Sequence, residues 1–184
     1  MNNEEISHSG DVDEIINTYQ KQNISAVQNH LRFADNKDFN NEHIKLLELK
    51  IFSPKGDSID VESGFKIKIK FLNKKANINL ALSFTIFSKD DVLLMEAPTY
   101  ISRNFDSEIS IYEIEQEFPG YLLNSDFYNL GVLFGENQQI VLMNINNILT
   151  FEIKDTLFNR GINYNKFPGI IRPQFKSTIN KIHE

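Results

Sequence analysis

Polar and aromatic side chains that could bind a sugar alternate with apolar ones in three segments, 80–87, 126–134 and 149–154. If these segments are strands of one sheet in a two-layer sandwich, their polar sides share its outer face. The CH faces of a sugar ring pack on aromatic rings, and its hydroxyls hydrogen-bond to amides, hydroxyls and carboxylates. Adding two residues of the loop that follows 92–97, we expect a carbohydrate-binding site made of Ser83, Thr85, Phe87, Tyr100, Arg103, Asn129 and Glu152.

Two surfaces also have a plainer interpretation. An ordinary exposed or partner-covered sheet fits the face just described equally well, and a one-residue change of register would exchange its two faces. Lys66, Lys68 and Lys70 form a basic row that could bind an acidic partner. A solvated sheet face explains this row better, because charged rows also protect sheets against aggregation.

Residue types that support catalysis or metal binding are present without the necessary spacing. The four histidines, at positions 8, 30, 43 and 183, do not have the spacing of a metal site. Asp90 and Asp91 lie in a predicted turn, where aspartate is common for backbone reasons. There is no cysteine and no glycine-rich phosphate loop. We therefore expect neither an enzyme nor a cofactor or metal site.

The strongest strand pattern lies in 65–71, where Phe65, Ile67, Ile69 and Phe71 alternate with the three lysines. A period of two is typical of a half-buried strand. Segment 80–87 alternates in the same way after a polar break at 73–75. The two segments are predicted to form an antiparallel pair whose apolar face a second layer covers.

Further strand signals follow at regular intervals, at 44–52, 92–97, 108–118, 126–134 and 148–154, with a loop or short strand at 140–147. Pro98 either ends its strand or marks it as a sheet edge. Seven or eight short strands with no intervening helix predict an all-β fold, an antiparallel two-sheet immunoglobulin-like β-sandwich. A short N-terminal helix is predicted at 12–22, and residues 23–42 are predicted to be a linker. The expected division is therefore an N-terminal segment, 1–42, and a sandwich domain, 43–184.

Composition limits the possible partners and compartments. The 184 residues carry a net charge of −6 and show no basic stripe, so we expect no nucleic-acid partner. No apolar run approaches the roughly 20 residues of a membrane helix, and the acidic N-terminus is not a secretory signal. These features predict a cytoplasmic protein.

Four segments are similar to motifs of one known family. Residues 9–19 resemble a G-x-x-x-x-V-I-x-x-Y helix that ends a nucleotide-binding domain. Residues 56–65 resemble a G-x-x-x-x-x-x-x-G lead into a strand, and residues 144–155 resemble D-x-x-x-x-x-x-F-x-V-x-D. Residues 169–175 resemble a closing G-x-[VI]-x-x-x-W, with Phe175 in place of tryptophan. In this order, the four segments resemble the C-terminal carbohydrate-binding domain of the ATP-binding subunit of Wzt-type O-antigen polysaccharide ABC transporters.

The resemblance implies a non-catalytic β-sandwich that recognises a lipid-linked O-polysaccharide at the cytoplasmic side of the inner membrane and selects it for export. It also implies a homodimer in which the C-terminal segment is an exchanged strand. No ATPase motif is present in this sequence, so contact with the membrane subunit is expected through an ATPase domain outside it. The alternative is a dimerisation or assembly module of the same transporter ATPase without affinity for glycans.

Overall fold

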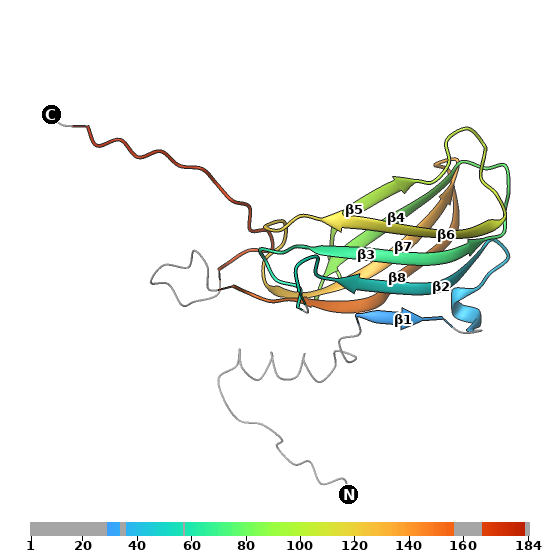
Figure 1. Ribbon diagram of the computed structural model, residues 1–184, viewed down its shortest axis with the longest axis horizontal. Coiled ribbons are helices and arrows are strands. Elements are labelled where there is room, and N and C mark those ends of the chain that lie inside the picture. Colours follow the sequence, from blue (N-terminus) through green and yellow to red (C-terminus); the bar gives the residue numbers. More distant parts are fainter. Residues whose placement is uncertain (1–28, 34–35, 57, 157–166, 183–184) are drawn as a thin grey trace, which may run out of the picture.

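A computed structural model describes residues 29–33, 36–56, 58–156 and 167–182. These residues form a sandwich of two antiparallel four-stranded sheets (Figure 1), which confirms the predicted all-β class. The predicted N-terminal helix lies outside the described residues. The strands are β1 (His30–Arg32), β2 (Ile44–Phe52), β3 (Phe65–Asn73), β4 (Leu80–Ser88), β5 (Leu93–Tyr100), β6 (Ser110–Phe118), β7 (Asp126–Glu136) and β8 (Ile140–Ile153), and Lys37–Phe39 form a short 3₁₀ helix, η1.

The strand order has an immunoglobulin-like arrangement. One sheet has the order β1-β2-β3-β6 and the other the order β5-β4-β7-β8, so the chain crosses between sheets after β3, β5 and β6. Near the start of β7, the Tyr128 hydroxyl donates a 2.9 Å hydrogen bond to the Asn124 carbonyl four residues upstream. A tyrosine bonded back in this way at the crossing between sheets is a recurrent feature of such sandwiches.

The predicted pairing of 65–71 with 80–87 is wrong, because β3 and β4 lie in different sheets. Strand β3 pairs with β2 and β6, and β4 pairs with β5 and β7. The connection from Asn73 to Leu80 is too long for a tight hairpin, and it carries the chain across the sandwich. The two alternating patterns are nevertheless complementary, because each strand turns its apolar side inward and the two sides together form much of the core.

The core is filled by aromatic and branched side chains from both sheets. Phe65, Ile67, Ile69 and Phe71 of β3 are fully buried, as the alternation predicts. The Phe65 ring stacks on Phe118 of β6 with centroids 4.6 Å apart and lies 5.2 Å from Phe151 of the opposite sheet.

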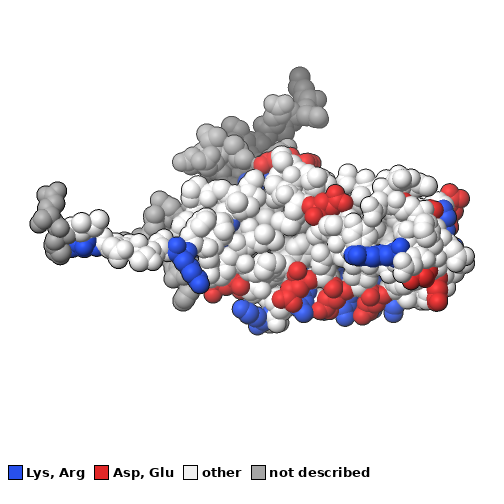
Figure 2. All heavy atoms as spheres, turned by 90° about the horizontal axis from the view of Figure 1, so that it is seen from above, with Lys and Arg blue, Asp and Glu red and all other residues white. Residues whose placement is uncertain are grey.

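The lysine row of β3 is matched by a glutamate row on β6. Lys66 lies 3.0 Å from Glu115 and 3.3 Å from Glu117, and Lys68 lies 3.3 Å from Glu113. Hydrogen bonds and charge attraction from the glutamates raise the pKa of Lys66 and Lys68. Acidic and basic side chains are interspersed along one margin of the molecule in Figure 2. The row is therefore a locally neutralised, solvated sheet face, which favours the plainer of its two interpretations.

Several element boundaries differ from the sequence prediction. The segment 140–154 is predicted as two pieces, whereas Ile140–Ile153 form one strand, β8. Its pairing with β7 shifts register between Leu130 and Val132 and again between Phe134 and Gly135. Strand β5 continues through Pro98 to Tyr100 and lies at a sheet edge. Of the two predictions for Pro98, the edge strand is therefore correct and the strand end is wrong. Strand β1 lies inside the predicted linker and pairs with β2. The nearby Phe33 is 8% exposed and belongs to the core, so this stretch contributes to the sandwich.

Within the segment 56–65, singled out as a motif, residues 60–64 form the turn before β3. The Asp60 carboxylate accepts hydrogen bonds from the backbone N–H groups of Glu62 and Ser63, at 2.9 and 2.7 Å. Gly64 has a φ of +64°, and a Cβ there would lie 2.2 Å from the Phe118 carbonyl. Only glycine fits both constraints, which gives a structural reason for this glycine.

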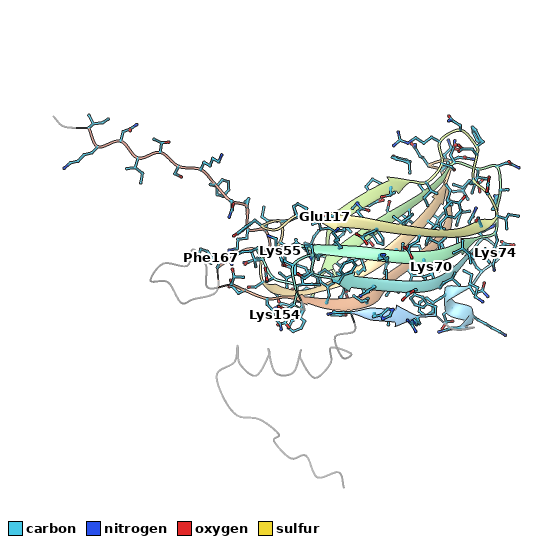
Figure 3. All side chains as sticks on the ribbon, in the orientation of Figure 1. Lys55, Lys70, Lys74, Glu117, Lys154 and Phe167 are labelled. Atoms are coloured by element: carbon cyan, nitrogen blue, oxygen red, sulfur yellow. The ribbon has the colours of Figure 1, made fainter. Side chains whose placement is uncertain are left out.

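The C-terminal segment leaves the sandwich at one end, near Phe167 (Figure 3), and runs away from it (Figure 1). Asn124 holds its beginning, because the side-chain amide donates to the carbonyls of Phe167 and Gly169 at 2.7 and 2.8 Å. Arg172 adds a 2.7 Å ion pair with Asp155. Beyond this point the described residues have no regular secondary structure.

Candidate functional site

The sheet predicted to carry the site is confirmed, since β4, β7 and β8 are neighbours in it. On its outer face Ser83 lies opposite Leu133 of β7 and Pro98 of β5. One step along β4, Thr85 lies opposite Gly131 and Glu96. The register therefore places the predicted polar side of β4 outward, between two strands that also supply outward side chains.

A cavity of about 500 Å³ lies over one end of this face. Its floor is made of small or apolar residues, including Ala81, Leu133 and Gly135, and its walls come from β5 and from the hairpin between β7 and β8. Ser83 and Tyr100 are the two predicted site residues that line it. The full lining is Ala81, Ser83, Glu96, Pro98, Tyr100, Leu133, Gly135, Gln138, Gln139, Ile140 and Val141.

A second hollow of about 340 Å³ adjoins this cavity, with Ala81, Tyr100 and Gln138 in both linings. Arg103 lines the second hollow, and its guanidinium carbon lies 4.6 Å from the centre of the Tyr100 ring. Such a cation–π contact restricts both side chains and leaves the guanidinium N–H groups free to donate. The predicted rim pair of Tyr100 and Arg103 thus lies together at the junction of the two hollows.

The hairpin wall was missed by sequence reasoning. Asn137 and Gln138 both have positive φ, 55° and 60°, and the Gln139 N–H donates to the Glu136 carbonyl at 3.0 Å. Positive φ at both central residues of a turn closed by this hydrogen bond is the geometry that matches strand twist. The turn presents Gln138 and Gln139 beside Ile140 and Val141, which are 54% and 62% exposed. The asparagine at the turn was the available signal, but its partner is glutamine rather than the usual glycine.

The other predicted residues lie toward the opposite end of the face. The Thr150 hydroxyl donates to the Asn129 side chain at 2.7 Å, and the side-chain amides of Asn129 and Asn147 donate to Asp91 at 3.3 and 2.9 Å. Phe87 is the cross-strand neighbour of Asn129. The turn aspartate Asp91 therefore has a structural role, because it accepts from two asparagines of neighbouring elements.

The predicted site is consequently divided. Ser83, Tyr100 and Arg103 lie at the cavities, and Phe87 and Asn129 lie at the other end. Glu152 lies beyond this second group, opposite Phe127. Thr85 stands between the two groups and is only 8% exposed.

No group of three histidine, aspartate or glutamate side chains suited to a metal occurs in the described ranges. His30 instead bonds to Glu48 at 2.5 Å, and His43 lies 3.3 Å from Glu42. Within the part of the chain that the structure covers, no helix has the length and apolar character needed to cross a membrane.

Comparisons with known proteins agree with the fold. No family model matches the sequence, and no curated protein matches it. Among solved structures, the crystal structure of the C-terminal domain of Wzt is similar to this chain, with a TM-score of 0.52 and 16% sequence identity. The match covers 77% of this chain and 86% of that one. At this identity the likeness establishes a shared fold, and it extends over most of both domains.

Proposed function

We propose that this protein is a non-catalytic recognition domain for a lipid-linked O-antigen polysaccharide, which it selects for export by an ABC transporter at the cytoplasmic face of the inner membrane. The observation that carries the proposal is the 500 Å³ cavity on the outer face of the β5-β4-β7-β8 sheet. The four resembling segments and the fold shared with the Wzt C-terminal domain support the choice of ligand and transporter.

The cavity has the size and chemistry that a sugar requires. Ligand sites have volumes of roughly 300–1,000 Å³ and combine an apolar lining with a few polar groups. Here the Tyr100 ring can pack against the CH face of a sugar, and Ser83, Gln138 and Gln139 supply donors and acceptors for its hydroxyls. At the rim, Glu96 adds a negative charge to the cavity and Arg103 adds a positive charge to the adjoining hollow.

An NMR titration tests the proposal directly. The isotope-labelled chain is titrated with O-polysaccharide from its own source strain and, separately, with polysaccharide from an unrelated strain. We expect shifts in the cavity residues, seen with the first glycan only. Because such affinities are often weak, with dissociation constants of about a micromolar to a millimolar, the titration extends to millimolar repeat units. Absence of shifts with both glycans would reject glycan recognition.

A pair of variants locates the site. Tyr100→Ala removes the aromatic wall, and we expect it to weaken binding roughly tenfold, because stacked rings contribute about 0.5–1.5 kcal/mol beyond their buried area. Ile111→Ala is the control, since Ile111 is 55% exposed on β6 of the other sheet. Equal binding by both variants would place the glycan elsewhere on the molecule.

The second candidate function is an assembly module that dimerises through the C-terminal segment. The observation that favours it is the exposure of Phe175, Ile179 and Ile182, at 83%, 93% and 89%. Apolar side chains in this number and this degree of exposure mark interaction sites. Sedimentation equilibrium tests it, because a chain ending at Gly169 should be monomeric whereas the full chain is dimeric. If both are monomers, the segment is not the dimer contact.

A further inference from the structure

The Thr85 hydroxyl is unusual among the polar groups of the sheet face. In the described ranges, its Oγ1 is the only buried side-chain nitrogen or oxygen without a hydrogen-bond partner. Buried polar groups in folded proteins are almost always paired, so an unpaired one calls for a specific explanation. Nearby hydroxyls follow the rule, since Thr150 bonds to Asn129 and Thr99 of β5 bonds to Gln116 at 3.0 Å.

The hydroxyl lies close to Gly131 of the neighbouring strand β7. A Cβ on Gly131 would lie 2.4 Å from Thr85 Oγ1, so any side chain on β7 at this point would occupy the space next to the hydroxyl. The same Cβ would lie 3.3 Å from Cε2 of Phe87. The edge of the Phe87 ring and the hydroxyl thus approach the same point over Gly131.

This point lies next to residues that line the cavity. Ser83, the preceding outward residue of β4, and Glu96, the cross-strand partner of Thr85, both line the cavity. Phe87, the next outward residue, leads to Asn129 at the other end of the face. An opening over Thr85 would therefore join the two groups of candidate residues into one groove.

We infer that Thr85, Gly131 and Phe87 form a closed subsite, in which the Phe87 ring covers a hydroxyl that a bound polysaccharide reaches when the ring turns outward. The inference rests on the proposed function and extends it. The cavity binds one part of the glycan, and the next sugar along the chain lies over Gly131. There one of its hydroxyls pairs with Thr85 Oγ1, and the displaced Phe87 ring packs against its CH face. The unpaired hydroxyl of the free protein is then satisfied in the complex.

The first test compares stability with binding in Thr85→Val. Valine keeps the shape and removes the unpaired hydroxyl, so the melting temperature should rise by about 2–4 °C. Affinity for O-polysaccharide of the source strain, measured by calorimetry, should fall about two- to tenfold, which is the effect of one hydrogen bond. Thr85→Ser keeps the hydroxyl and should bind as the wild type does.

Thr99→Val is the matched control. The same chemical change removes a paired hydroxyl outside the cavity, so it should lower the melting temperature and leave binding unchanged. If Thr85→Val binds the polysaccharide as tightly as the wild type, the subsite is refuted and the proposed function stands. If the wild type binds no polysaccharide, both are refuted.

The second test addresses the Phe87 cover. In Phe87→Ala the Thr85 hydroxyl is open without any ring movement. The association rate constant for the same polysaccharide should therefore rise severalfold, because no ring has to turn outward before the polysaccharide binds. Thr85→Val should still weaken binding in this background. An unchanged association rate would refute the cover.

Discussion

The hydroxyl of Tyr128 donates to the backbone carbonyl of Asn124, and the side chain of Asn124 in turn donates to two carbonyls of the C-terminal segment. Asn124 is 1% exposed, and its own backbone N–H donates to the Ile170 carbonyl at 2.8 Å. The crossing into β7 and the beginning of the C-terminal segment are therefore held by one hydrogen-bonded group.

Removing the Tyr128 hydroxyl should destabilise the sandwich. Burial raises the pKa of this hydroxyl, which stays protonated and able to donate. Tyr128→Phe leaves the ring in the core and deletes the donor, so we expect the free energy of unfolding to fall by about 1–2 kcal/mol in urea titrations. Tyr100→Phe is the control and should change stability little, because Tyr100 is 42% exposed. Equal effects would show that the Tyr128 hydrogen bond contributes nothing specific.

Releasing Asn124 should detach the C-terminal segment while the sheets remain folded. Asn124→Ala removes both side-chain donors to Phe167 and Gly169, and about 1–3 kcal/mol of stabilisation is lost locally. Hydrogen exchange should then be faster in residues 121–125, where the backbone bond to Ile170 protects the amide in the wild type. Exchange in β3 serves as the internal control and should not change. Unaltered protection at 121–125 would mean that Arg172 and its ion pair with Asp155 suffice to hold the segment.

The charged face should give a small, pH-dependent contribution to stability. The hydrogen bond from Lys66 holds the pKa of Glu115 below its ordinary value of 4.5. A lowered folded-state pKa means that the contribution is complete above pH 4.5 and disappears as the pH falls through the folded-state value. Glu115→Gln should therefore melt slightly below the wild type at pH 7, and the two melting temperatures should converge in acid.

Salt and a control variant sharpen this test. At 1 M NaCl the difference at pH 7 should shrink, because screening acts within roughly 3 Å and these side chains are exposed. Glu96→Gln removes a glutamate for which the described chain offers no ion pair, and should follow the wild type throughout. A difference between Glu115→Gln and the wild type that persists in acid would point to packing rather than charge.

Local pattern predicted the elements well, and long-range pairing less well. Strand signals located β2 at its observed bounds. Alternation identified the buried side of β3, because burial of one face imposes a period of two. Alternation carries no information on which strand lies next to which, so β3 and β4 were paired wrongly. The three-strand grouping of β4, β7 and β8 was correct because it came from the fold class rather than from local pattern.

For the candidate site, too, local pattern predicted some features and long-range arrangement determined the others. The outward positions of β4 followed from its period, and two predicted rim residues, Tyr100 and Arg103, do lie together. The wall formed by Gln138 and Gln139 depends on how far a hairpin projects over the sheet, which the local sequence does not determine. The separation of Asn129 from the cavity likewise depends on position along β7, since every second residue of a strand shares a face but not a site.

Gly131 provides the sharpest stability test of the sheet face. In Gly131→Ala the new Cβ would lie 2.4 Å from Thr85 Oγ1 and 3.0 Å from the Ile145 carbonyl, and that backbone atom cannot turn away. We expect the free energy of unfolding to fall by about 1–3 kcal/mol. Gly135→Ala is the matched control on the same strand, because its nearest contact would be 3.7 Å and a gain of about 0.4–1 kcal/mol is expected.

A double-mutant cycle separates the two contacts of Gly131. Thr85→Ala removes the closer one, so in that background Gly131→Ala should be less destabilising, with a coupling of at least about 0.5 kcal/mol between the two substitutions. The remaining loss would report the Ile145 carbonyl, which Thr85→Ala leaves in place. Urea titration of the wild type, the two single variants and the double variant gives both the coupling and the remaining loss. If Gly131→Ala is as stable as Gly135→Ala, or if the two substitutions are additive, the close approach of Thr85 to β7 is not what requires glycine there.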